Sequence, residues 1–217
     1  MPAPALQAAQ TLLSDVDVLI RTAEQATGGT PGRPAGDLGP LKRAATALCY
    51  TAWEVYVEDS LIWLAERAGT VSTPGDLPAA LRVATEQHAK GSDPWILAGE
   101  GWRQAVADVV TDATRGRGED GSGGLNTANS QNVEKLQQRF LGESLLAKCR
   151  WQRRTNAGVR HEIDRLVTVR GRIVHRGETP DDLELEGVRF WRRFINRLCE
   201  KLDGHVEAYA ESHLAPR

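Results

Sequence analysis

Apolar residues recur along most of this chain at the three- and four-residue spacing of an amphipathic helix. Alternating runs of β-branched and aromatic residues between hairpin turns, which would predict strands, are almost absent. The spacing predicts helices at about 5–26, 41–68, 78–90, 94–113, 130–140 and 157–176, and a last helix from Thr179 to about Tyr209. The fold is therefore expected to be all-α.

Glycine and proline mark the ends of these helices, because both residues interrupt helical structure. They predict a loop at 28–34 and a flexible glycine-rich insert near residues 115–128. The segment 44–53 contains no charged residue, which predicts a helix buried on most of its sides. No internal repeat is visible, so we expect a single domain over residues 1–217.

The last two helices carry the clearest end signals. Gly177 follows the first of them as a C-terminal cap. The second opens on Thr179-Pro180-Asp181-Asp182, which supplies a cap, a proline for the first turn and acidic residues. Because the connection is short, we expect the two to form an antiparallel C-terminal helix pair within a helical bundle.

Composition excludes several classes of protein. The chain has 217 residues, of which 41% are hydrophobic and 26% charged, as in ordinary globular domains. No run approaches the roughly 18 apolar residues of a membrane span, and the first residues do not resemble a signal peptide. Cys49, Cys149 and Cys199 are far apart, which predicts buried thiols in a cytoplasmic protein with no membrane partner.

The formal net charge of −2 conceals an uneven distribution. Residues 1–138 carry −6, residues 139–197 carry +6 and residues 198–217 carry −2. Thirteen of the fourteen basic residues in the middle block are arginines. The helix at 157–176 and its approach hold Arg150, Arg153, Arg154, Arg160, Arg165, Arg170, Arg172 and Arg176. They form either a solvated helix face or a surface that binds phosphates, which suit the planar guanidinium group.

The most informative segment runs from Leu166 to Gly177 and contains Arg170 and His175. On a helix these two side chains are separated by about 140° around the axis, so they can flank one face but do not stack. A second protomer could complete a site between them. Alternatively, His175 could serve only the helix dipole and Arg170 a structural ion pair.

This segment resembles the R-x(4–6)-H motif of the HEPN superfamily, in the form found in RiboL-PSP-HEPN proteins. Two upstream segments resemble the same family in the same order: 47–56, a helix with Glu54 in an apolar setting, and 129–136, an N-x-x-N-V-x-x-L pattern. The resemblance extends over about residues 40–205 and implies an all-α HEPN-like bundle.

The resemblance also implies a function. Such proteins are metal-independent endoribonucleases of anti-phage or toxin–antitoxin systems, and they act as homodimers with the motif helix at the interface. The resemblance implies that Arg170 and His175 are catalytic. It also implies that RNA is the substrate and that an antitoxin or sensor protein is a further partner. Neither a cofactor nor a metal is expected. From their positions, we expect Arg172, Arg176 and Arg165 to bind flanking phosphates. Glu54 would orient a motif arginine or form a structural ion pair.

One residue departs from the family pattern. The position after the motif arginine is usually polar in the family, whereas this chain has Gly171. The site either tolerates the loss, or is catalytically impaired, or uses glycine for a close approach between helices. An impaired site would leave a non-catalytic helical module that binds RNA or a partner protein. A helical interaction domain without any role in RNA is the third hypothesis.

Overall fold

The computed structural model describes residues 4–26, 37–71, 73–91, 93–116, 124–178 and 183–214. Its α-helices are α1 (Pro4–Ala26), α2 (Gly39–Ala68), α3 (Ala79–Gly91), α4 (Gly101–Arg115), α5 (Ser130–Leu141), α6 (Asn156–Arg176) and α7 (Leu185–His213). The described ranges contain no strand, only an isolated bridge between Trp151 and Arg154. The predicted all-α class is therefore confirmed.

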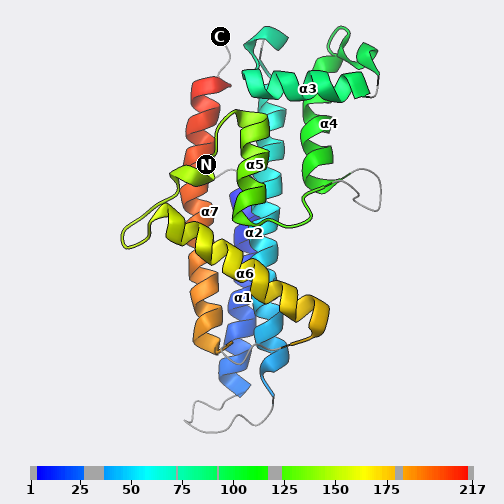
Figure 1. The fold of residues 1–217 in the computed structure, drawn as a ribbon. Coiled ribbons are helices and arrows are strands. Elements are labelled where there is room, and N and C mark those ends of the chain that lie inside the picture. The colour runs from blue at the N-terminus through cyan, green and yellow to red at the C-terminus, as the bar shows by residue number, and fades with distance from the viewer. Residues whose placement is uncertain are drawn as a thin grey trace.

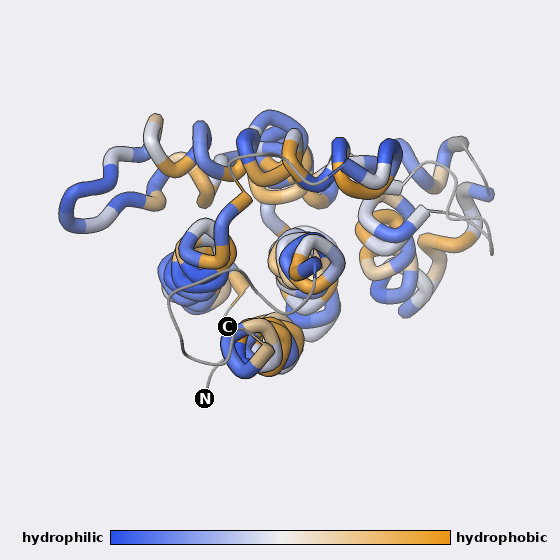
Figure 2. Tube along the Cα trace, turned by 90° about the horizontal axis from the view of Figure 1, so that it is seen from below, coloured by the Kyte–Doolittle hydropathy of each residue, from blue (hydrophilic) through white to orange (hydrophobic). Residues whose placement is uncertain are grey.

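The long helices α1, α2 and α7 lie side by side as a bundle, while α6 crosses it and α3 lies across one end (Figure 1). Viewed along the bundle, the three helices turn hydrophobic positions toward one another (Figure 2). The central element is α2, which contacts α1, α7, α4 and α6. Its uncharged stretch is buried at Ala45, Cys49, Tyr50 and Trp53, which explains the absence of charge in 44–53.

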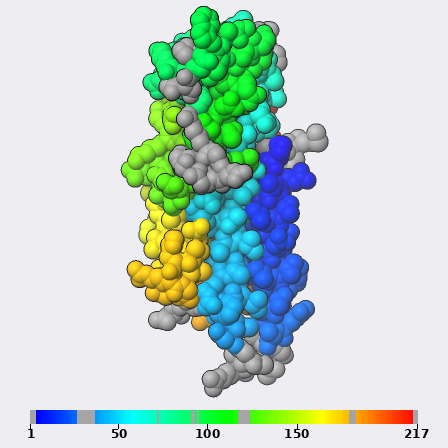
Figure 3. Space-filling model, turned by 90° about the vertical axis from the view of Figure 1, so that its right-hand side faces the viewer, coloured from blue at the N-terminus to red at the C-terminus, as the bar shows by residue number. Residues whose placement is uncertain are grey.

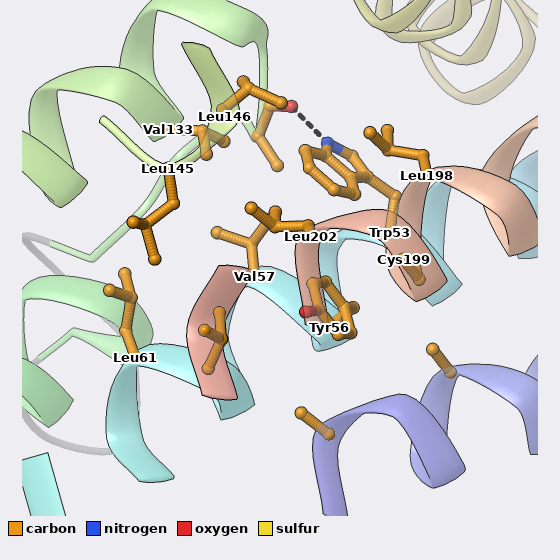
Figure 4. Close-up of a cluster of buried hydrophobic side chains, with 14 of the residues drawn as sticks. Trp53, Tyr56, Val57, Leu61, Val133, Leu145, Leu146, Leu198, Cys199 and Leu202 are labelled. Carbon is orange, nitrogen blue, oxygen red and sulfur yellow. Dashed lines mark hydrogen bonds between the residues drawn. The ribbon is translucent and has the colours of Figure 1, made fainter. Parts of the chain in front are cut away.

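The core continues from α2 into α5 and α7 (Figure 4). Leu198 and Leu202 of α7 lie beside Trp53 in this cluster. One polar contact lies within this core: the Tyr56 hydroxyl donates to Asp203 Oδ1 at 3.4 Å. Because an unpaired buried polar group is costly, this contact fixes α7 against α2 as well as filling space.

The predicted helix at 94–113 is wrong in one respect. A short 3₁₀ turn (Pro94–Leu97) precedes α4, and the chain passes between them through Gly99 with φ of +57°. Glycine adopts this left-handed conformation without steric cost, so the helical pattern is interrupted there.

The predicted start of the last helix at Thr179 is also wrong, because Leu183 and Glu184 are not helical and α7 begins at Leu185 with Glu184 at its N-cap position. The predicted loop at 28–34, residues 179–182 themselves and part of the glycine-rich insert lie outside the described residues.

The expectation of an antiparallel C-terminal helix pair is also wrong. Helix α7 packs along α1 and α2, whereas α6 crosses the bundle obliquely and contacts α2 and α5 (Figure 1). The two helices still touch through large side chains where they cross: the Arg165 guanidinium carbon lies 5.0 Å from the centroid of the Trp191 ring. A short connection therefore joined two helices that cross.

Other expectations from composition can be compared with the structure. All three cysteines are free and buried, as predicted, and burial raises the pKa of Cys49 and Cys149 to about 12. Within the described ranges, no helix has the length and apolarity needed to cross a bilayer.

Candidate functional site

The motif segment forms the C-terminal half of α6. Thr155 caps the start of this helix by accepting a hydrogen bond from the Gly158 N–H, and Gly177 ends it in the left-handed conformation with φ of +66°. The apolar stripe of α6 faces the core through Val159, Ile163, Leu166 and Ile173. Arg170 lies on the same face of the helix as this stripe, and His175 lies well away from it around the axis.

Arg170 rests on an aromatic ring of α2. Its guanidinium carbon lies 4.9 Å from the centroid of the buried Tyr50 ring, a distance typical of a cation–π contact. The Tyr50 hydroxyl donates to Glu54 Oε1 at 2.7 Å and accepts a hydrogen bond from the Ala128 N–H at 3.0 Å. Burial raises the pKa of Tyr50 well above its usual value, so the hydroxyl stays protonated and remains a donor.

The segment before α5 is held by the same region of α2. Trp53 Nε1 donates to the Ala128 carbonyl at 2.7 Å, the bond drawn in Figure 4, so both backbone groups of Ala128 are engaged. Asn129 then caps α5 by accepting from the Asn132 N–H. Ser130 donates to Asp164 of α6 from both its backbone N–H and its hydroxyl, each at 2.9 Å. The segment 129–136 therefore connects α5 to α6 and has a structural role.

Glu54 reaches the motif arginine only through Tyr50. No ion pair joins it to an arginine among the described residues, so of the two roles expected for it, the direct ion pair is not observed. Its charge also acts on Glu58, one turn further along α2. Burial and then the Glu54 carboxylate raise the pKa of Glu58 to about 7, against the opposing effect of Arg115.

His175 is exposed and makes no hydrogen bond or ion pair with any described residue. Beside it on the surface of α6 lie Val174, which is 52% exposed, and Gly171, where an added Cβ would meet no atom within 4 Å. This end of α6 lies at the surface next to α2 (Figure 3). Arg170 and His175 thus flank an uncovered surface without converging within one protomer.

The three arginines expected to bind phosphates all contact carboxylates. Arg172 and Arg176 share Glu178, at 3.0 and 3.7 Å. Arg165 pairs with Glu162 at 3.4 Å and covers Trp191, on a side of α6 away from Arg170. The structure therefore brings Arg172 and Arg176 together near the motif but leaves Arg165 apart from Arg170.

Sequence reasoning missed Tyr50 as the partner of Arg170. The four-residue spacing of Tyr50 and Glu54 was visible as a same-face pair on one helix. The contact with Arg170 joins positions 120 residues apart, and only the crossing of α6 over α2 creates it.

Comparison with known families agrees with this architecture. The chain matches the RiboL-PSP-HEPN family over residues 13–208, which includes most of α1 as well as the motif helix. No curated protein and no solved structure matches the chain. The match extends over nearly all described helices, and the chain therefore belongs to the RiboL-PSP-HEPN family.

Proposed function

We propose that this protein is a metal-independent endoribonuclease that cleaves RNA to 2′,3′-cyclic phosphate and 5′-hydroxyl ends. Membership of a HEPN family indicates a ribonuclease-type or RNA-related function. The observation that supports cleavage of RNA in particular is that the two motif residues are not held in ion pairs with any described residue. Arg170 and His175 form no ion pair with described residues, whereas Arg172 and Arg176 are both occupied by Glu178.

The active unit in this proposal is a homodimer with α6 at the interface. Within one protomer, Arg170 and His175 point about 140° apart around the helix. A second copy docked on the surface formed by Val174 and Gly171 would cover exposed apolar area and place its own motif opposite the first. Each site would then combine residues from both copies.

The chemistry follows from the residue types. The 2′-hydroxyl of one ribose attacks the adjacent phosphorus, and the bond from phosphorus to the 5′-oxygen breaks. The imidazole of His175 in one protomer accepts the proton of the 2′-hydroxyl. The imidazole of His175 in the other protomer donates a proton to the leaving 5′-oxygen. Arg170 would stabilise the negative charge that builds on the phosphoryl oxygens. Tyr50 and Glu54 would hold Arg170 in place without touching the RNA.

The cellular role proposed here is that of an effector in an anti-phage or toxin–antitoxin system acting in the cytoplasm. This proposal is supported by the resemblance of the motif segment, residues 166–177, to the HEPN superfamily, whose members often act in such systems. An antitoxin or sensor protein would then restrain the nuclease until it is needed.

Cleavage of a defined RNA in the presence of EDTA tests the nuclease. Wild-type protein should produce cyclic phosphate ends, and a substrate with a 2′-O-methyl group at the cut site should stay intact. His175→Ala should lower the rate of cleavage by about 100-fold or more, while Glu86→Gln on α3 serves as a folded control. If wild type and His175→Ala leave the RNA equally intact, the proposal fails.

Gly171 favours a second candidate, a non-catalytic module that binds RNA or a partner protein. The glycine is not required by the packing of its own protomer, because an added Cβ meets open space. Gly171→Asn restores the polar residue usual in the family and can be assayed beside wild type. Cleavage that appears only in the Gly171→Asn protein would identify the natural chain as the non-catalytic form.

A further inference from the structure

A second concentration of positive charge lies at the opposite end of α6. The segment 147–156 and the middle of α7 enclose an open basin of about 1,180 Å³, which we call the basic basin. Its cationic side chains are those of Lys148, Arg150, Arg153, Arg154 and Lys201. The only carboxylate among its lining residues is that of Glu200.

The walls of the basic basin are fixed by hydrogen bonds. The Asn156 side chain donates to the carbonyls of Leu146 and Cys149, at 2.7 and 3.1 Å, and thereby closes the segment into a loop. Two backbone hydrogen bonds between Trp151 and Arg154, of 3.1 and 2.9 Å, form a tight turn at its tip. The basin therefore exists before any ligand arrives.

The tip of this turn is strained. Arg153 has φ of +63°, and it is the only non-glycine residue with positive φ in the part of the chain that the structure describes. A left-handed conformation costs an arginine roughly 1 kcal/mol, which glycine would avoid and asparagine would reduce. Strain of this kind often accompanies function, and here it places a cation at the rim of the basin.

Three of the five cations of the basic basin lack carboxylate partners among the described residues, whereas Lys148 pairs with Glu143 at 2.6 Å and Arg154 with Glu162 at 3.1 Å. Arg150, Arg153 and Lys201 form no ion pair with any described residue. By contrast, carboxylates neutralise Arg160, through Glu134 at 3.0 Å, as well as Arg165, Arg172 and Arg176. Glu200 of the basin is engaged by Asn196 and Arg197. The basin thus keeps uncompensated positive charge.

A histidine inside the basin responds to this field. Burial lowers the pKa of His205, and the charges of Lys148 and Lys201 lower it further. A hydrogen bond to the Lys148 backbone and the charge of Glu143 act in the opposite direction. The imidazole is therefore neutral at pH 7, and it adds a hydrogen-bonding group to a positively charged surface.

We propose that the basic basin binds the phosphates of single-stranded RNA and anchors the substrate away from the cleavage motif. The volume exceeds what one small phosphate compound fills, and the cations are spread over two elements. Trp151 also lines the basin while packing against Phe194, with ring centroids 6.0 Å apart. An indole beside a groove of cations can stack on an unpaired base, as in other single-strand binding proteins.

This anchor rests on the proposed nuclease function but is spatially separate from it. Asn156 and Arg170 are fourteen residues apart on one straight helix, which corresponds to about 20 Å. The anchor would hold a flanking stretch of the strand while the motif acts elsewhere along it. It therefore favours RNA long enough to reach both places.

Binding can be measured without cleavage by introducing the variants into His175→Ala protein. The probe is a fluorescein-labelled 20-nucleotide oligouridine, titrated at 50 and 200 mM salt. The basin variant combines Arg150→Ala, Arg153→Asn and Lys201→Ala; asparagine tolerates the left-handed conformation at 153. The matched control removes the same charge elsewhere, through Arg21→Ala, Arg82→Ala and Lys90→Ala on α1 and α3, whose residues do not line the basin.

The basin variant should bind the oligouridine at least 10-fold more weakly and reduce the slope of log Kd against log salt by about 2. The control should stay within about 2-fold of the parent. Equal affinities of the basin variant and the control, whether both unchanged or both weakened, would overturn the proposal. Circular dichroism spectra and thermal midpoints of all variants separate loss of binding from loss of fold.

A parallel cleavage assay in proteins that retain His175 distinguishes the two proposals. RNA cleaved by wild type but bound equally by the basin variant and the control would overturn the anchor and leave the nuclease standing. Weakened binding by the basin variant, together with no cleavage by wild type, would support the anchor and overturn the nuclease.

Discussion

Arginines lie both at the C-terminal end of α6 and in the segment just before its N-terminus, but they differ in how many have carboxylate partners. At the C-terminal end, Arg172 and Arg176 are paired with Glu178, and the motif residues Arg170 and His175 remain outside these pairs. Just before the N-terminal end, Arg150 and Arg153 line the basic basin together with Lys201, and none of the three has an ion-pair partner among the described residues, although Lys148 and Arg154 of the same basin do.

The two groups of cations differ in what they are suited to do: Arg170 is held in a fixed orientation, whereas Arg150 and Arg153 of the basic basin are exposed to solvent. Arg170 gains orientation from Tyr50, because a cation fixed on a buried ring loses little entropy when it meets a phosphate. The basin cations are exposed at Arg150 and Arg153, and they suit long-range attraction of a polyanion. In the two proposals, the same residue type would therefore serve chemistry near the motif and affinity in the basic basin.

The largest predicted effect is on the rate of RNA cleavage, and it tests whether the motif and the basic basin have separate roles. His175→Ala should lower the maximal rate of RNA cleavage by about 100-fold or more, because it removes the proton-transfer group. The basin variant should instead raise the RNA concentration needed for half-maximal cleavage about 10-fold. Steady-state kinetics on one long RNA measures both. If the basin variant lowers the maximal rate as strongly as His175→Ala, the two ends do not have separate roles.

The next effect concerns the ring beneath Arg170. Tyr50→Phe keeps the ring but leaves the Ala128 N–H unpaired, and should lower the free energy of unfolding by about 1–3 kcal/mol in urea titrations. Tyr50→Leu also removes the cation–π contact and should reduce cleavage further than Tyr50→Phe, when rates are compared per folded molecule. Equal rates for the two variants would show that the ring does not position Arg170.

A smaller effect is expected at the C-terminal end of α6, where removing one carboxylate should leave arginines unpaired, as Arg150 and Arg153 of the basic basin are among the described residues. Glu178→Gln removes the carboxylate shared by Arg172 and Arg176, and releases both for phosphates. We expect oligouridine affinity to rise about 3-fold and its salt dependence to steepen, measured by fluorescence anisotropy. Glu86→Gln, on exposed surface of α3, removes the same charge as a control. An affinity unchanged relative to that control would show that these arginines do not contact RNA.

The smallest effect is on the titration of His205. Lys201→Ala removes one of the charges that oppose protonation, so the pKa of His205 should rise toward its ordinary value of about 6.5. The folded-state pKa lies below the ordinary value, so protonation disfavours the fold as the pH drops below about 6.5. NMR titration of the imidazole measures the change, with Arg82→Ala as the control. No difference between the two variants would show that His205 does not sense the basin.

Much of the local structure could be read from periodicity. The helical segments, the cap at Gly177 and the burial of the uncharged 44–53 stretch follow from spacing that involves only near neighbours. The errors concern helix boundaries or contacts between elements distant in sequence. Gly99 divided a predicted helix, α7 begins at Leu185 rather than Thr179, and the oblique course of α6 goes with its contacts to α2 and α5.

The candidate site shows the same division. Arg170 and His175 could be selected from their motif, and the positive block around them from charge counting along the chain. Which arginines are neutralised could not be predicted, since Arg160 meets Glu134 from another helix and Arg172 meets Glu178 beyond the helix end. Lys201 joins the basic basin from α7, about fifty residues after Arg150.

The sequence by itself determined the all-α class, the family and the identity of the motif pair, because these depend on residue types at short spacing. Tertiary structure alone decided that Tyr50 carries Arg170, that His175 faces outward on an uncovered surface, and that the arginine block divides into paired and unpaired groups. The physical reason is that cation–π contacts, ion pairs and basins form between elements distant in sequence. Their partners are set by how helices cross.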